Sequence, residues 1–211
     1  MNNEMSTGLF YHDTATDPEK FMGLHPRFSA LGTKGVNAGG QIIDAGGTGS
    51  DNTSVWFVVW GDQTNHMLYP KGTRAGLQRE DKGKTTKTNS DGSMLDVHRE
   101  KFTWDIGFSV RDWRYISRIA NIDVSDLRAG TVDIFAFMRQ AFYRLKQRTI
   151  TGGRVSIYCN AEVLEALDAG TTGDARVFLK PMEVEGKQVL AYRGIPLREC
   201  EAILNTEARI V

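Results

Sequence analysis

The sequence predicts an α+β fold with a mixed or antiparallel sheet and a few helices. An apolar, β-branched and aromatic run, SVWFVVW at 54–60, is typical of a buried strand. Residues 131–148 have the apolar spacing of an amphipathic helix, and short strand-like segments follow between 154 and 200. Strands, helix, strand, helix and strands in that order are characteristic of the α+β class.

The first 53 residues are expected to be extended and loop-rich. They hold few periodic apolar positions and many glycines, notably in GTKGVNAGGQIIDAGGTGSDNTS at 32–54. We therefore expect a segment 1–53 that lies over a core formed by residues 54–211.

Residues 54–110 contain three further strand-like stretches. The short stretch 66–69 follows the apolar run closely enough to pair with it as a hairpin, and 70–91 is a polar excursion rich in Gly, Lys and Thr. Strand character returns at 95–97 and 102–110. In the latter, alternation puts four apolar side chains on one face, namely Phe102, Trp104, Ile106 and Phe108.

Two helices are predicted next. In 111–127, Tyr115, Ile119 and Ile122 fall at helical spacing, and a basic stripe, Arg111/Arg114/Arg118, lies on another face. Residues 131–148 carry a longer stripe and a basic last turn, with Thr131 as the capping residue. The stripe consists of Val132, Phe135, Met138, Phe142 and Leu145.

The last third of the chain reads as a strand, a helix and further strands. RVSIYC at 154–159 alternates as a strand does, and Asn160 is placed to cap a helix that Gly170 would end. Short strands are expected at 176–179, 188–192 and 195–200.

The composition describes a soluble globular protein without a dominant charge. Among 211 residues, 26 Lys and Arg balance 26 Asp and Glu, so no overall field attracts nucleic acid or an anionic membrane. The longest apolar run is too short to span a bilayer, and the N-terminus lacks the pattern of a secretory signal. Two cysteines without a CxxC pair fit synthesis in a reducing cytoplasm.

No motif for catalysis or cofactor binding is present. The four histidines lack ligand spacing, and GGTGSDNT at 46–53 is interpreted as a flexible connection because it feeds a strand and not a helix. Cys159 precedes a helix cap, where a thiolate can be activated, but a small buried hydrophobe is the favoured interpretation. We expect neither metal nor cofactor.

Two charged stretches are the candidate contact surfaces. Residues 71–87 have a net charge of +4, and residues 156–175 have a net charge of −4. On a neutral chain, separated patches of opposite sign suit head-to-tail contact between copies, although both could be ordinary solvated faces. The candidate residues are Lys71, Arg74, Arg79, Lys82, Lys84, Glu162, Glu165, Asp168 and Asp174. The stripe of Arg111, Arg114 and Arg118 could meet carboxylates, phosphates or water.

Five blocks of the sequence resemble the major capsid proteins of tailed bacteriophages that have the Hong Kong 97-type shell fold. The blocks, in chain order, are FYHDTATDPEKFMGL (10–24), DAGGTGSDNTSVWFVVWGDQT (44–64), YPKGTRAGLQRED (69–81), WDIGFSVRDWRYISRIANID (104–123) and YRGIPLRECEAILNTEARI (192–210).

The resemblance implies a non-enzymatic shell subunit with peripheral and axial domains, which joins copies of itself into hexamers and pentamers of a virion capsid. Other capsid or scaffolding proteins are further partners that it implies, and packaged double-stranded DNA would be contacted only non-specifically. Family members carry a further N-terminal arm, extension loop and spine helix. The resemblance therefore implies a shortened peripheral (P) domain and impaired assembly.

Two other functions are left open by the residues alone. One is a homo-oligomeric binding module of unrelated function, and the other is a hydrolase that uses Cys159. An enzyme needs a pocket with converging titratable groups, whereas a shell subunit needs surfaces complementary to its own copies.

Overall fold

The computed structural model describes residues 2–72, 76–146, 153–171, 179–184 and 186–211. The chain divides into two compact units, a larger one of residues 1–66 and 108–211 and a smaller one of residues 67–107. Residue 53, after which the core was expected to begin, lies inside the larger unit.

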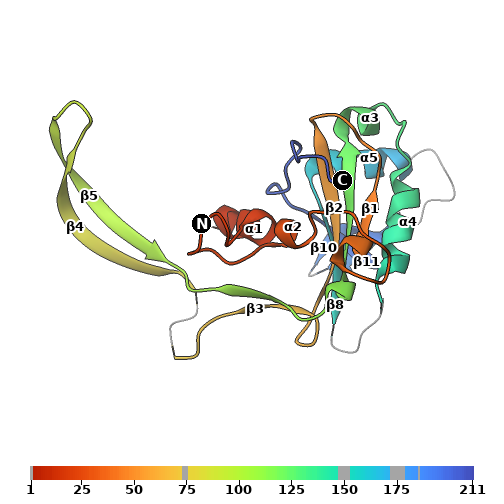
Figure 1. The fold of residues 1–211 in the computed structure, drawn as a ribbon, viewed down its shortest axis with the longest axis horizontal. Coiled ribbons are helices and arrows are strands. Elements are labelled where there is room, and N and C mark those ends of the chain that lie inside the picture. Colours follow the sequence, from red (N-terminus) through yellow and green to blue (C-terminus); the bar gives the residue numbers. More distant parts are fainter. Residues whose placement is uncertain (1, 73–75, 147–152, 172–178, 185) are drawn as a thin grey trace. The chain divides into compact units, whose positions relative to one another are not determined.

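A mixed sheet forms the centre of the larger unit (Figure 1). Its strands are paired in the order β1-β7-β2-β8-β11-β10-β9. The pairs β1–β7 and β8–β11 are parallel, and the other neighbours in this order are antiparallel. The predicted mixed sheet is therefore confirmed. The strands are β1 (Ile42–Asp44), β2 (Asn52–Trp60), β7 (Ile116–Asp123), β8 (Arg154–Cys159), β9 (Leu179–Val184), β10 (Lys187–Tyr192) and β11 (Ile195–Glu199).

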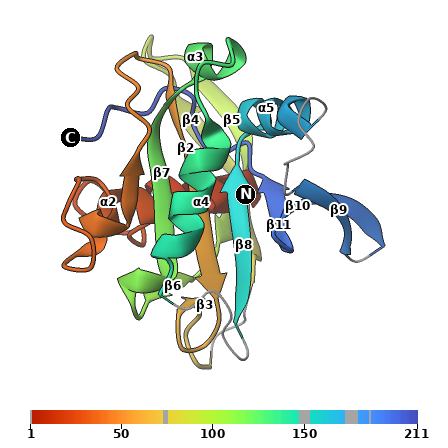
Figure 2. The ribbon, with the colours of Figure 1, turned by 90° about the vertical axis from the view of Figure 1, so that its right-hand side faces the viewer.

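β2 is covered on both faces, which explains its nearly continuous apolar sequence. Val55, Phe57 and Val59 belong to one hydrophobic cluster with the helices α3 (Val124–Arg128), α4 (Ile134–Arg144) and α5 (Ala161–Thr171). Figure 2 shows α4 lying across this face of β7, β2 and β8. Trp56, between these positions, packs on the other face against aromatic rings of the N-terminal segment.

α4 confirms the predicted amphipathic helix within shorter limits. Met138 and Leu145 are buried, and Phe135 and Phe142 pack against the same cluster with part of their surface exposed. The cap is Asp133, whose carboxylate accepts the Ala136 N–H at 3.1 Å, and not Thr131. Thr131 Oγ1 instead donates to the Asp126 carbonyl at the end of α3, so the cap prediction is wrong. Residues 147 and 148 lie outside the described residues.

The N-terminal segment contains helices where loop or extended structure was expected. These are α1 (Asn2–Tyr11), α2 (Leu24–Arg27) and a 3₁₀ turn at Ala38–Gln41. Phe10 and Phe28 are buried, each with its ring centre 6.0 Å from that of Trp56. A few side chains near their C-terminal ends, such as Phe10 and Phe28, anchor α1 and α2 to the sheet. Their sequence therefore lacks the repeated apolar stripe by which an amphipathic helix is recognised.

Residues 111–127 are not the helix that their spacing suggested. A 3₁₀ turn at Trp113–Tyr115 leads into β7, and α3 follows. Opposite Ser54, β7 has an extra residue, and Asn121 there adopts a positive φ of 57°. This β-bulge breaks the period-two alternation, and β7 is buried on both faces, so Ile119 and Ile122 took on a helix-like spacing. The basic stripe on one helix face therefore does not exist.

The other predicted elements are partly confirmed. β8 has the predicted bounds, and Asn160 Oδ1 accepts the Val163 N–H at 3.0 Å as the cap of α5, which ends at Thr171, one residue past Gly170. Strands β10 and β11 lie where strands were expected, whereas 176–178 are outside the described residues.

Two predictions for residues 66–110 are wrong. β3 (Asn65–Leu68) meets β2 at one pair, Trp60 with Asn65, in the parallel direction, so 54–60 and 66–69 form no hairpin. The predicted strand 102–110 is interrupted after Thr103, and a separate strand, β6 (Gly107–Val110), follows. The polar stretch 70–91, for which no secondary structure was predicted, contains a regular strand over residues 78–88.

The smaller unit is built on a twisted ribbon of two antiparallel strands, β4 (Gln78–Thr88) and β5 (Met94–Thr103) (Figure 1). Its ladder runs from Gln78 opposite Thr103 to Thr88 opposite Met94, with a β-bulge at Lys82 and Gly83. Gly83 has a positive φ of 69°, a conformation that favours glycine. The described side chains of both strands are exposed or half-exposed.

Candidate subunit-contact surfaces

The predicted basic residues lie in the smaller unit. Arg79, Lys82 and Lys84 project from β4, and Lys71 lies in the preceding turn, all four exposed. Arg74 is outside the described residues. The sequence-predicted patch is therefore part of the ribbon and its approach.

Carboxylates of the ribbon itself compensate part of this positive charge. Arg79 donates through Nε to Glu100 Oε2 at 2.9 Å, and its Nη2 pairs with the other carboxylate oxygen. Lys82 forms an ion pair with Glu80. The pKa of Glu80 is lowered, mainly by its hydrogen bond with Lys82, next by the charge of Lys82 and more weakly by that of Lys101. The charge of +4 counted along 71–87 already includes Glu80, and Glu100 of β5 further reduces the positive charge that a partner would meet.

Strand alternation sorts the ribbon into two different faces. One, here called the basic face, carries Lys82, Lys87, Arg99 and Lys101 against one acid, Glu80. The opposite face has Arg79 and Lys84 against three acids, Asp81, Asp96 and Glu100. Arg99 and Lys101 come from β5 and were missed by the sequence analysis. They can be assigned to this face only when the register of β4 against β5 is known.

The acidic candidates project from α5. Glu162 is paired with Arg128 of α3, with Arg128 Nη2 2.6 Å from its carboxylate. Glu165 and Asp168 are exposed one and two turns further along. Asp174 is outside the described residues. Glu162 is therefore already engaged within the subunit.

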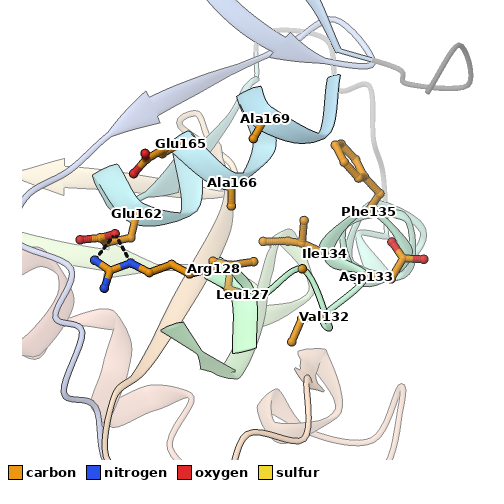
Figure 3. Close-up of a pocket in the computed structure, with 11 residues that line it drawn as sticks. Leu127, Arg128, Val132, Asp133, Ile134, Phe135, Glu162, Glu165, Ala166 and Ala169 are labelled. Atoms are coloured by element: carbon orange, nitrogen blue, oxygen red, sulfur yellow. Dashed lines mark hydrogen bonds and ion pairs between the residues drawn. The ribbon is translucent and has the colours of Figure 1, made fainter. Parts of the chain in front are cut away.

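Two grooves flank α5. The first has a volume of about 500 Å³ and lies among α3, the start of α4 and α5 (Figure 3). Leu127, Ile134 and Ala166 point into it, and the Arg128–Glu162 pair lies at one end. This groove is therefore apolar inside, and the charge of Glu162 at its rim is compensated by Arg128.

The second groove, here called the acidic groove, lies between α5 and the strands β10 and β11. It has a volume of about 380 Å³. Three carboxylates line it, Glu165, Asp168 and Glu199, over apolar side chains of Ala161, Leu164 and Leu190. Among its described lining residues there is no Lys or Arg. Glu199 was not a sequence candidate, because it lies far beyond the end of α5 in the sequence and only the β8–β11 pairing brings it near.

The three arginines of the predicted stripe have separate environments, and Arg111 is exposed. Arg114 pairs with Asp112 at 2.7 Å. Arg118 is completely buried, and its Nη2 donates to Glu207 Oε2 at 2.8 Å while Nη1 donates to the Phe28 carbonyl at 2.6 Å. Its guanidinium carbon also lies 4.7 Å from the ring centre of Trp56. Arg118 is a structural residue that joins β7 to α2 and the C-terminal segment.

Glu207 is the counterpart at the centre of this network. Besides Arg118 it accepts hydrogen bonds from the hydroxyl groups of Tyr11 and Ser54. Burial, followed by the charge of Glu207, raises the pKa of Tyr11. The N-terminal helix, β2, β7 and the C-terminal segment therefore meet at one buried ion pair.

Cys159 has none of the features of an activated nucleophile. It is fully buried in the hydrophobic cluster, and burial raises the pKa of its thiol to about 12, with a smaller contribution from Glu199. A thiol in this state is protonated at neutral pH, so the hydrolase alternative loses its nucleophile. The described residues also contain no group of three His, Cys, Asp or Glu side chains arranged to hold a metal ion.

The loop 46–51 is tied to its surroundings. Gly47 N donates to the Asn121 carbonyl at 2.8 Å, and a Cβ on Gly47 would lie 2.5 Å from that same oxygen. Asp51 accepts from the Ser125 amide at 3.1 Å. The glycines here allow close packing against the β7 bulge, a role other than that of a free connection.

These features define an α+β protein whose candidate sites are exposed charged surfaces. Comparison with known proteins gives the family. The model of the family "Major capsid protein GP7" matches residues 1–211. The chain is also similar to a capsid chain of bacteriophage epsilon15 solved by electron cryo-microscopy, with 32% identity and a TM-score of 0.66. The match covers 99% of this chain and 63% of the epsilon15 chain. None of the curated proteins matches.

The chain therefore belongs to the major capsid protein GP7 family. Its fold is of the Hong Kong 97-like type found in phage capsid proteins, as the resemblance implied. The family and the fold are structural and not enzymatic. Among the described residues, no helix is both long and apolar enough to cross a membrane.

Proposed function

We propose that the chain is a structural subunit of a phage or prophage icosahedral capsid. Copies of it contact one another head to tail and close into hexamers and pentamers around packaged DNA. The family match over the whole chain is the observation that carries this proposal. The subunit would be made in the bacterial cytoplasm and would become part of the virion, with other capsid or scaffolding proteins as further partners.

The contact surfaces support a head-to-tail arrangement. The ribbon of the smaller unit presents basic side chains, and α5 presents acidic ones, so a surface of one copy can meet a different surface of the next. Exposed ion pairs contribute only about 0–1 kcal/mol each, so such contacts form and dissociate easily before apolar contacts fix them. Reversible pairing lets many identical copies correct their register.

Contact with DNA is proposed to be non-specific. The net charge of the chain is zero, and the sequence contains no motif that reads base edges. Basic side chains would meet only the phosphate backbone, whose affinity falls steeply with salt.

Light scattering and negative-stain microscopy of the purified chain, at low and at high ionic strength, test the proposal. We expect oligomers or ring-like particles at low salt and their dissociation as the salt concentration rises. A chain that stays monomeric at high concentration and low salt would contradict self-association.

A further inference from the structure

The two faces of the β4–β5 ribbon differ in what they can bind. The basic face has four Lys and Arg side chains against one Glu, a net charge of +3. Leu95 lies on the same face with 54% of its surface exposed, and Val97, two residues further, is half-exposed. Apolar side chains exposed among bases indicate a partner surface that combines carboxylates with apolar residues.

The acidic groove has the complementary composition. Glu165, Asp168 and Glu199 surround Ala161, Leu164 and Leu190. The other groove beside α5 matches less well, because Arg128 lines it and engages Glu162.

The spacing of the charges also corresponds. Arg99 and Lys101 are alternate residues of a strand, so their Cα atoms are about 7 Å apart. Glu165 and Asp168 are three residues apart on a helix, which puts their Cβ atoms about 5–6 Å apart. The long side chains of Arg and Lys can span this small difference.

From this correspondence we propose that the basic face of one copy docks into the acidic groove of a second copy. Arg99 and Lys101 meet Glu165 and Asp168, and Leu95 and Val97 lie over the apolar side chains of the groove. The inference rests on the proposed function and deepens it. The basic contact residues now come from both strands of the ribbon and not from the stretch 71–87 alone, and the acidic contact residues no longer include Glu162.

Nucleic acid is a less suitable occupant of the basic face. The opposite face of the same two-stranded ribbon bears Asp81, Asp96 and Glu100. A phosphate backbone would be repelled by these carboxylates, which oppose the attraction of the Lys and Arg side chains. A phosphate backbone also offers no apolar surface against which Leu95 and Val97 could be buried.

Charge exchange between two variants tests the contact. The ribbon variant carries Arg99→Glu and Lys101→Glu, and the groove variant carries Glu165→Lys and Asp168→Lys. All four positions are exposed, and circular dichroism establishes that each variant is folded. Sedimentation velocity at low salt should show at least tenfold weaker self-association for each variant alone. An equimolar mixture should restore association, because each reversed surface then faces a reversed partner.

Matched controls separate the faces from net charge. Lys34→Glu with Arg209→Glu changes the net charge of the chain as much as the ribbon variant does, at exposed positions outside the ribbon. Glu19→Lys with Asp62→Lys matches the groove variant in the same way, at exposed positions outside the groove. Both controls should associate like the wild-type chain.

Several outcomes would overturn the inference. If the wild-type chain associates but the mixture does not recover, or if the controls weaken association equally, the docking contact is wrong while the proposed function stands. If duplex DNA binding, measured by fluorescence anisotropy, is lost in the ribbon variant and self-association is not, the basic face belongs to nucleic acid. A monomeric wild-type chain would overturn both the inference and self-association.

Discussion

β2 and β4 are both long strands, but they are stabilised in different ways. Residues 52–59 of β2 are all buried, between the α4 cluster on one face and Phe10 and Phe28 on the other. The described residues of β4 are exposed or half-exposed, and β4 pairs with one strand, β5. Isolated two-stranded ribbons are marginally stable in water. Burial therefore stabilises the strands of the larger unit, whereas the side chains of the ribbon remain exposed to solvent and to possible partners.

The buried ion pair of the larger unit should contribute far more to the free energy of unfolding than the exposed ion pair of the ribbon. Glu207→Gln leaves Arg118 charged and buried without a counter-charge, which we expect to cost about 3–5 kcal/mol of unfolding free energy. Glu100→Gln breaks the exposed pair with Arg79 in the ribbon and should change the midpoint of unfolding very little. Urea denaturation measures both. Equal losses in the two variants would refute the distinction.

Two methionines give a similar contrast for packing. Met138 of α4 is fully buried in the hydrophobic cluster, so Met138→Ala should cost about 2–5 kcal/mol. Met94 at the start of β5 has 71% of its surface exposed, and Met94→Ala should leave stability within about 0.5 kcal/mol of wild type. Thermal unfolding followed by circular dichroism distinguishes them. A large loss for Met94→Ala would mean that the ribbon has a core of its own.

The ribbon should respond locally to a change at its bulge. Gly83 has a positive φ and open space around its α-carbon, so Gly83→Ala is opposed by backbone strain alone, about 1–2 kcal/mol. Amide hydrogen exchange should become faster in β4 and β5 and stay unchanged in β2 and β7. Faster exchange throughout the chain would show that the two units unfold together.

Acid should weaken the N-terminal side of the larger unit. Burial, and next the charge of Arg118, lowers the pKa of His25 below its usual 6.5, and the charge of Glu207 partly opposes them. The folded state therefore binds fewer protons than the unfolded state, so stability is present above pH 6.5 and decreases as the pH falls below it. His25→Gln should flatten this dependence in urea titrations at pH 5 to 7. An unchanged slope would exclude His25 as its source.

The strongest predictions from the sequence concerned segments whose periodicity is undisturbed. The apolar run of β2, the stripe of α4 and the Asn160 cap before α5 all have local causes that a sequence displays. The wrong predictions have causes that are not visible in the sequence. In β7 a bulge at Asn121 and burial on both faces produce a spacing that resembles a helix. α1 is held by a few side chains near its C-terminal end, such as Phe10 on Trp56 and Tyr11 on Glu207.

The contact surfaces were predictable only in part. Lys82 and Glu165 were identified because charges near one another in sequence are visible as a local excess. Arg99 and Glu199 were missed, because each reaches its surface through strand pairing with a distant segment.

By itself the sequence determined the α+β class, the buried central strand, the main amphipathic helix and the family to which the chain belongs. Only the tertiary structure decided which charges share a face and which arginine is buried. Pairing register and burial join residues far apart in the chain, as Arg118 and Glu207 are joined across 89 positions. Local periodicity carries no information about such pairs, because it records only which side of its own element each residue faces.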